Sequence, residues 1–451
     1  MIEASGQVRG TGASDEYWFD RFKTIGIFQA YEYFNDDPAS FERQRHAFFS
    51  DSSRNPEFGY PLLSDDLIEV NERSLLALRD ELLEKEKDVV IRNAYLWRIE
   101  EKIAEAGLLR AAAHGDMLNF RECSESVYGA PNVEIFSHTI HEIRDRFESA
   151  RLTAGETLRG HIDDFLSAFP ESEAHVDVSL PDEALRAEVF QKIRREFGRI
   201  ADMTTSETEK VGSDGIKTAF GKALEKLGIT DWTISLETTG NPLIRTDQVR
   251  KSIIIPADRI VTVSELSRLL IHEIATHAER RSNGERTRFL LLSLGLDHYE
   301  VGEEGIAAVR EQAFKTDTDT FSFSGLEGYF SIGLAYGVSD GIRRDFRDVF
   351  SVMKRYYRII NLSKGMSPTD AEQHANESAW TRCFLTFRGT DCKTMGVCFT
   401  KDIIYRKGNI AIWDSLREQS GSMDLWNVGK YDPSNDRHRW LLERLRISRL
   451  P

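Results

Sequence analysis

The residues most suited to chemistry lie in one short segment, Leu270-Ile-His-Glu-Ile-Ala-Thr-His-Ala-Glu-Arg280. His272 and His277 offer two imidazole ligands, and Glu273 places a carboxylate beside the first of them. In the HExxH pattern of zinc peptidases, histidines four residues apart share one helix face because about 400° separates them. The spacing here is five residues, which on an ideal α-helix turns the second histidine roughly 140° away. A single π-type turn restores the alignment, so we predict a widened helix between His272 and His277.

A third ligand is expected from a second acidic segment, Gly302-Glu-Glu-Gly-Ile-Ala-Ala-Val309, which begins an apolar helix about 25 residues after His277. Two histidines and one glutamate, with one position left for water, form a recurrent catalytic zinc set. We therefore predict one Zn²⁺ ion per chain, bound by His272, His277 and Glu304. Glu303 is the alternative ligand, and otherwise we expect it to face solvent in the first turn of its helix.

Glu273 is predicted to act as the general base of this site. Bound zinc lowers the pKa of water toward about 7, so a neighbouring carboxylate can accept its proton and later pass that proton to the leaving amine. Thr276 is predicted to bond back to a helix carbonyl, which would favour the widened turn. Structural roles at the end of the helix are expected for Arg280 and Arg281.

The segments around these residues predict an α+β fold dominated by helices. Thr262 and Glu265 have capping-box spacing and mark the start of the buried helix that carries His272. A turn is predicted at Asn241-Pro242. Helices are predicted at 75–83, 95–113, 181–200, 215–227, 339–361 and 368–388, and strands at 232–236, 251–256 and, as a two-stranded stretch turning at 407–409, at 403–413.

The chain is predicted to contain three parts. Residues 1–14 are rich in Gly, Ser and Thr and are expected to form a disordered tail. Residues 15–165 are expected to form a helical N-terminal region that packs on the catalytic part. Residues 166–451 are expected to form the zinc metallopeptidase domain.

Composition excludes several classes of function. The net charge of −15 and the pI of about 5.4 argue against a nucleic-acid-binding surface. The four cysteines form no CxxC pair, which argues against a cysteine-rich zinc module and a disulfide scaffold. No signal peptide and no apolar stretch long enough to span a membrane is recognised, so the cytoplasm is the expected compartment.

These motifs resemble those of a family of zinc metallopeptidases named for a QEGLA motif, whose animal members are the microtubule-associated tyrosine carboxypeptidases. The family pattern is HEIxTH, then an Arg and an Asn, then EGLA. It is matched by His272-Glu-Ile-Ala-Thr-His277, Arg280 or Arg281, Asn283, and Glu304-Gly-Ile-Ala307. Glu303 replaces the Gln of the motif and Ile306 replaces its Leu. Similarity extends to 55–60, 128–131 and 387–405, and so covers most of the chain after about residue 15.

The resemblance implies a HExxxH zinc site with Glu304 as third ligand, in a zincin-like core with a small antiparallel sheet. It also implies a carboxypeptidase that releases a C-terminal residue, an aromatic one being a candidate, from a peptide or peptide-like substrate with a free C-terminus. Microtubule binding is not expected, because tubulin tails are acidic and this chain carries a charge of −15.

A carboxypeptidase must hold the free α-carboxylate of its substrate with a cation, best a bidentate Arg. Arg388 is the first candidate because Gly389 permits a close-approach loop. The other candidates are Arg382, Lys401 and Arg406. Tyr405 is a candidate for polarising the oxyanion.

Two other interpretations stay open. The same zinc site suits an endopeptidase or an amidase acting on small amino-acid conjugates. Alternatively, the chain is a non-catalytic interaction protein stapled by zinc. A structural site closes its fourth position with protein, so this interpretation requires a fourth ligand such as His298 or a cysteine.

Overall fold

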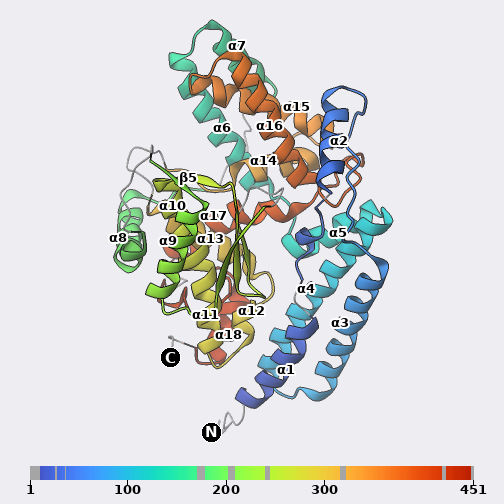
Figure 1. Cartoon of the computed structure of the whole chain (residues 1–451), viewed down its shortest axis with the longest axis vertical. Coiled ribbons are helices and arrows are strands. Elements are labelled where there is room, and N and C mark those ends of the chain that lie inside the picture. Colours follow the sequence, from blue (N-terminus) through green and yellow to red (C-terminus); the bar gives the residue numbers. More distant parts are fainter. Residues whose placement is uncertain are drawn as a thin grey trace.

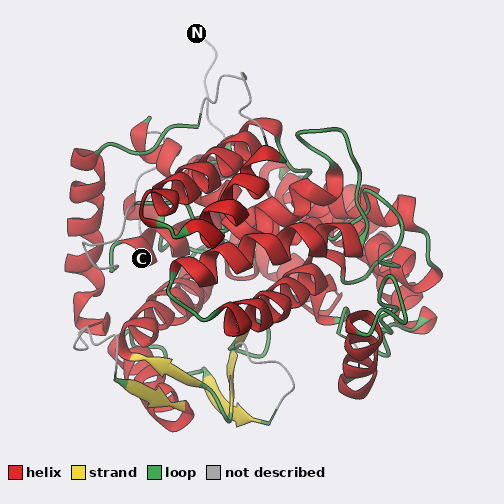
Figure 2. Ribbon diagram, turned by 90° about the horizontal axis from the view of Figure 1, so that it is seen from above, coloured by secondary structure: helices red, strands yellow, loops and turns green. Residues whose placement is uncertain are grey.

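The computed structural model describes residues 11–25, 28–35, 37–169, 178–201, 209–238, 244–314, 321–418 and 423–447. Most of these residues are helical, and the strands form two small sheets gathered at one side of the molecule (Figure 2). The predicted class, α+β with helices dominant, is confirmed. No helix in these ranges combines the length and the apolar character needed to cross a membrane.

The described residues up to Ser167 form helices joined by loops. These helices are α1 (Thr11–Ile25), η1 (Ala30–Glu32), α2 (Pro38–Phe49), α3 (Asp65–Lys85), α4 (Val89–His114), α5 (Met117–Tyr128), α6 (Val133–Thr153) and α7 (Glu156–Ser167). Side chains that accept backbone N–H groups start several of them, such as Ser64 before α3 and Asp88 before α4. Because α1 begins at Thr11, the predicted disordered tail is wrong for residues 11–14, and residues 1–10 lie outside the described part.

The rest of the chain carries the candidate metal-binding residues and contains all the described strands (Figure 1). Its helices are α8 (Glu183–Ala201), α9 (Ser213–Lys226), α10 (Val263–Leu269), η2 (Leu270–Ala278), α11 (Glu279–Arg286), α12 (Leu291–Leu294), α13 (Tyr299–Gln312), α14 (Leu326–Tyr336), α15 (Phe346–Ser363), α16 (Pro368–Phe387), η3 (Thr400–Asp402), α17 (Ile403–Arg417), η4 (Met423–Leu425) and α18 (Asp436–Arg444). The helix predicted from about residue 339 begins at Phe346 instead, because Asp345 accepts the N–H of Asp348 and caps it there.

The three-stranded sheet is mixed, so the expected antiparallel sheet is only partly correct. Its order is β2 (Thr233–Glu237), β4 (Ser252–Pro256), β3 (Arg245–Asp247). The central strand β4 pairs parallel with β2 on one side and antiparallel with β3 on the other. A separate antiparallel pair joins β1 (Lys210–Gly212) to β5 (Ile260–Thr262). The turn predicted at Asn241-Pro242 lies outside the described residues.

The two-stranded stretch predicted at 403–413 is wrong, because this segment is helix α17. Its Gly408 lies against α13: a Cβ there would be 2.1 Å from the carbonyl oxygen of Val301. Gly305 of α13 meets the carbonyl of Gly408 in the same way. Glycine therefore serves here as a contact between two closely packed helix backbones and not as a turn residue.

Replacing Gly408 by Ala is expected to destabilise the protein by about 1–3 kcal/mol, because the new methyl group overlaps a backbone oxygen that cannot easily move. Urea unfolding measures the change. The matched control is Gly221→Ala in α9, where a Cβ meets nothing within 4 Å. That variant should gain roughly 0.5–1 kcal/mol, the ordinary preference of a helix for Ala over Gly. Equal stability of Gly408→Ala and the wild type would contradict the close approach.

Two buried apolar cores hold these elements together. One joins residues of α1 to α7 with residues of α14, α15 and α16, so it extends across residue 165. In Figure 1, α6 and α7 accordingly lie beside α15 and α16 at the top of the molecule. The other core packs α8, α9 and the central strand β4 around η2, α13 and α17. The candidate metal-binding residues belong to elements of this second core.

Candidate metal centre

The helix that carries both histidines is widened to a π-helix in η2, as the five-residue spacing predicts. Thr262 starts the preceding helix by accepting the N–H of Glu265 at 3.1 Å, which confirms the predicted cap. The hydroxyl of Thr276 donates to the carbonyl of Ile271 at 2.9 Å, five residues back, which also confirms the predicted back-bond. The two imidazole rings, of His272 and His277, consequently lie with their centroids 4.7 Å apart.

His272, His277 and Glu304 form a group that can hold a metal ion. One ligand atom from each lies within 4.8 Å of the others. The carboxylate of Glu304 is 3.5 Å from Nε2 of His272 and 3.9 Å from Nε2 of His277. No other group of at least three His, Cys, Asp or Glu side chains in the described ranges has this arrangement. The predicted ligand set is therefore brought together by η2 and α13.

A carboxylate occupies the Nδ1 side of each imidazole. Glu311 lies 2.5 Å from Nδ1 of His272, and Glu303 lies 2.9 Å from Nδ1 of His277. Since an ionised carboxylate only accepts, Nδ1 of each ring donates to it, and Nε2 is the ring atom available to a metal ion that displaces its proton. Glu303 is therefore an orienting partner of His277 and not a ligand. The alternative expectation, that Glu303 faces solvent, is wrong because its side chain is buried.

Glu303 is also the centre of a buried ion-pair cluster. Its carboxylate accepts from Arg280 and, at 2.6 Å, from Lys430, and all three side chains are almost fully buried. Burial alone would raise the pKa of Glu303, but the two cations and His277 outweigh it and hold the pKa well below its usual range. Arg280 thus has a structural role, but in this ion-pair cluster and not at the end of its helix as predicted.

The electrostatics around the imidazoles favour a bound cation. Burial would lower the pKa of His272, but the carboxylates of Glu311, Glu273 and Glu304 outweigh it and raise the pKa to about 10. Oε2 of Glu304 is buried and has no hydrogen-bond partner among the described residues. A buried carboxylate oxygen without a donor is costly, and a metal ion would satisfy it. The residues present therefore fit a divalent cation.

Glu273 lies beside the ligands and contacts the edge of the sheet. The hydroxyl of Thr246, on edge strand β3, donates to Oε2 of Glu273. This bond orients the carboxylate and leaves Oε1 available for a proton. Sequence patterns gave no sign of Thr246, because its strand is only three residues long.

A cavity of about 620 Å³ contains this group, and every substrate-binding candidate named above except Arg406 lines it: Arg388, Arg382, Lys401 and Tyr405. Arg382 forms an ion pair with Asp402. Lys401 lies 4.0 Å from the carboxylate of Glu300. Arg406 instead binds His138 and Glu142 at the far side of α17, because it follows Tyr405 and so points elsewhere on the helix.

The charge of Arg388 helps to lower the pKa of Asp402, and its Nε has no hydrogen-bond partner among the described residues. Its guanidinium carbon lies 5.7 Å from the ring centre of Tyr31 and 5.2 Å from that of Phe399. Gly389 has a φ of 83°, its N–H donates to Tyr60, and a Cβ there would lie 2.8 Å from the ring of Phe120, so the glycine allows close packing in this loop. Tyr31 comes from the N-terminal region, and only the tertiary fold reveals its place in the cavity.

The fourth ligand that a structural zinc site requires is missing from the described ranges. Nδ1 of His298 donates instead to the carbonyl of Val127 at 2.9 Å. None of the four cysteines joins the metal-ligand group. The group thus leaves room for non-protein ligands.

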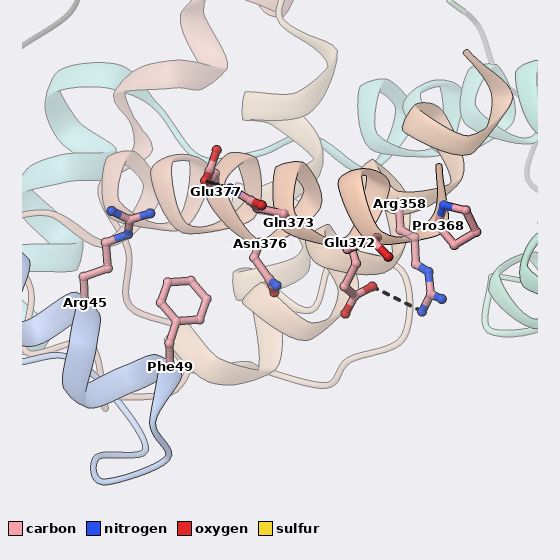
Figure 3. A pocket seen from close by; sticks show the side chains of 9 residues that line it. Arg45, Phe49, Arg358, Pro368, Glu372, Gln373, Asn376 and Glu377 are labelled. Atoms are coloured by element: carbon pink, nitrogen blue, oxygen red, sulfur yellow. Dashed lines mark hydrogen bonds and ion pairs between the residues drawn. The ribbon is translucent and has the colours of Figure 1, made fainter. Parts of the chain in front are cut away.

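A second hollow, of about 720 Å³, lies between α2, α15 and α16 (Figure 3). Glu372 and Arg358 form an ion pair of 3.3 Å there, and polar side chains, most of them partly buried, make up most of its lining. It contains no histidine or cysteine. The cavity beside η2 is therefore the stronger candidate for chemistry.

A scan against models of known protein families and a search of curated proteins find no match to this chain.

Proposed function

We propose that this chain is a cytoplasmic zinc-dependent metallopeptidase of the carboxypeptidase type, with a zincin-like catalytic core. One observation carries the proposal: the His272, His277 and Glu304 group shares its cavity with the guanidinium of Arg388, whose Nε has no hydrogen-bond partner among the described residues. A guanidinium with a free donor beside a metal-binding group suits a substrate with a free α-carboxylate. The family resemblance of the metal-binding motifs points to the same reaction.

In this proposal each side chain has one task. His272, His277 and Glu304 hold Zn²⁺, which when bound polarises the scissile carbonyl and lowers the pKa of water in the site. Glu273 takes a proton from the attacking water on its free Oε1 and passes it to the nitrogen of the leaving residue as the C–N bond breaks. Thr246 keeps that carboxylate in place.

Tyr405 is proposed to donate a hydrogen bond to the developing oxyanion. The charge of Glu304, followed by burial, raises the pKa of Tyr405 well above its ordinary value. The phenol therefore stays protonated at neutral pH and acts as a donor. Lys401 lies between the rings of Tyr405 and Tyr31 and adds positive charge to the same wall of the cavity.

The proposed substrate is a peptide or peptide-like molecule with a free C-terminus. Neither nucleic acid nor microtubules suit a chain with a net charge of −15. An endopeptidase or amidase would use the same metal group but would not need the carboxylate contact. A purely structural zinc site would require the fourth protein ligand, which the described residues do not provide.

The wild type is expected to cleave a free-acid peptide about 10- to 100-fold faster than its C-terminal amide, and Arg388→Met should lose this preference. The reason is that a hydrogen bond to a charged group contributes about 1.5–3 kcal/mol. Mass spectrometry of matched peptide libraries, digested with and without a chelator, gives kcat/KM for both substrates.

The control for this experiment is Arg73→Met, which removes an exposed arginine of α3 and should keep the wild-type preference. Equal rates on acid and amide in the wild type would favour the endopeptidase or amidase alternative. Absence of any chelator-sensitive cleavage would refute the peptidase assignment.

A further inference from the structure

The widened turn in η2 changes the hydrogen bonds of the helix backbone and brings in a side chain from another helix. In an α-helix the N–H of Glu279 would donate to the carbonyl of Ala275, four residues back. Here it donates to the carbonyls of Ile274 and Thr276. The carbonyl of Ala275 accepts from Nη1 of Arg310 on α13. A side chain from a neighbouring helix thus donates to an acceptor that the N–H of Glu279 would use in an α-helix.

Arg310 connects this carbonyl to the second special bond of the turn. Its Nη1 also lies 3.2 Å from Oγ1 of Thr276, whose hydroxyl donates to the carbonyl of Ile271. Thr276 therefore accepts from Arg310 and donates to the start of the widened turn. Both side chains are buried, Thr276 completely and Arg310 to 2% exposure.

Arg310 is itself held firmly in place. Nη2 donates to Asn427 at 2.6 Å, and the guanidinium carbon lies 4.6 Å from the ring centre of Phe197. Asn427 donates in turn to Glu196 at 2.7 Å. The guanidinium is therefore fixed by contacts on the side away from η2, and its position relative to the turn is set by the surrounding fold.

The same helix face supplies the other contacts to η2. Glu303 and Arg310 are seven residues apart on α13: Glu303 contacts His277, and Arg310 contacts the carbonyl of Ala275 and the hydroxyl of Thr276. Glu304 and Glu311, also seven apart, both contact His272. Seven residues are about two helical turns, so α13 lies along η2 and contacts it at two levels.

We propose that Thr276 and Arg310 are positioning residues that lock η2 in its π conformation and thereby set the affinity of the metal site. The lock consists of the hydrogen bonds that Arg310 and Thr276 donate to the carbonyls of Ala275 and Ile271. These bonds stabilise the widened turn, which keeps His272 and His277 on one face of the helix. This inference rests on the proposed function in one respect, namely that the aligned histidines bind zinc.

The test compares Thr276→Val, which keeps the shape of the side chain but removes its hydroxyl, with Thr276→Ser, which keeps the hydroxyl. Zinc affinity of the purified full chain is measured by competition with a chromophoric chelator. Loss of an outer partner of a metal ligand typically costs about 10- to 100-fold in affinity, and we expect a loss of that size for Val. The Ser variant should stay within about threefold of the wild type. The visible spectrum of the Co²⁺-substituted protein should change in Val only.

The matched control is Thr139→Val. Thr139 is a buried threonine of α6 whose hydroxyl donates to the carbonyl of Ile135, four residues back. Its removal should lower thermal stability as much as Thr276→Val does, without changing zinc affinity or the Co²⁺ spectrum. If Arg310→Met folds, it should lose as much zinc affinity as Thr276→Val. If Arg310→Met does not fold, Thr276→Val alone tests the lock.

Hydrogen exchange in the metal-free protein tests the lock independently of zinc. Backbone amides of 275–280 should exchange at least about tenfold faster in Thr276→Val than in the wild type, and at the wild-type rate in Thr139→Val. Wild-type affinity, spectrum and exchange in Thr276→Val would overturn the inference while leaving the peptidase proposal intact. Accelerated exchange in Thr276→Val, together with a wild-type chain that binds no zinc, would instead overturn the proposed function and leave the lock supported.

Discussion

Glu273→Gln is expected to reduce kcat for peptide hydrolysis by about 10²- to 10⁴-fold, the usual contribution of a general acid–base residue. Glutamine keeps the size of the side chain and can still accept from Thr246, but it cannot take up a proton. Because Glu273 is not among the three ligand residues, the zinc content should remain one per chain. Elemental analysis and steady-state kinetics on the same preparation measure both quantities.

The matched comparison for this prediction is His272→Ala, which removes a ligand. It should lose zinc and activity together, whereas Glu273→Gln should lose only activity. A Glu273→Gln variant with wild-type kcat would remove Glu273 from the reaction. Full zinc content and activity in His272→Ala would disprove the ligand assignment.

Glu303→Gln is expected to lower the free energy of unfolding of the metal-free protein by about 3–5 kcal/mol, because it leaves buried cations without their counter-charge. Arg280 is 0% exposed and Lys430 is 1% exposed at their side chains, so water cannot replace the lost carboxylate. Urea unfolding monitored by circular dichroism measures this change. The same variant should bind zinc about 10- to 100-fold more weakly, since Glu303 orients His277.

The neighbouring substitution Glu304→Gln provides the control, because the two residues are adjacent on α13 and equal in size. Oε2 of Glu304 has no hydrogen-bond partner, so its loss should leave the stability of the metal-free protein nearly unchanged while zinc binding is lost. A similar stability loss in both variants would show that the Glu303 cluster has no special role. Wild-type stability of Glu303→Gln would show that Arg280 and Lys430 find other partners.

The elements around the site are predictable where their signals are local. The cap at Thr262, the strands near 233 and 252 and the widened turn all follow from neighbouring residues. The widened turn is the clearest case: two ligands five residues apart can share a helix face only if the helix gains a residue per turn.

The helix α17 shows where local signals mislead. The segment 403–413 is rich in residues that favour strands: Ile403, Ile404, Ile410, Ile412 and Trp413. Within it, Gly408-Asn409 resembles a turn. The deciding contact is between Gly408 and the backbone of α13, about 100 residues earlier in the chain. Packing against a distant helix overrides local preference, and no window of sequence contains that information.

The sequence by itself determines which atoms can bind a metal. The types and spacing of His272, His277 and Glu304 predict a ligand set, because helix geometry converts spacing directly into direction. The tertiary structure alone decides which carboxylate faces the Nε2 atoms of the two histidines and which ones contact Nδ1. Adjacent Glu303 and Glu304 are chemically identical, and only burial beside Arg280 and Lys430 separates their roles. Electrostatic interactions depend on distance and burial, and these arise only when α13, η2 and the segment after α17 pack together.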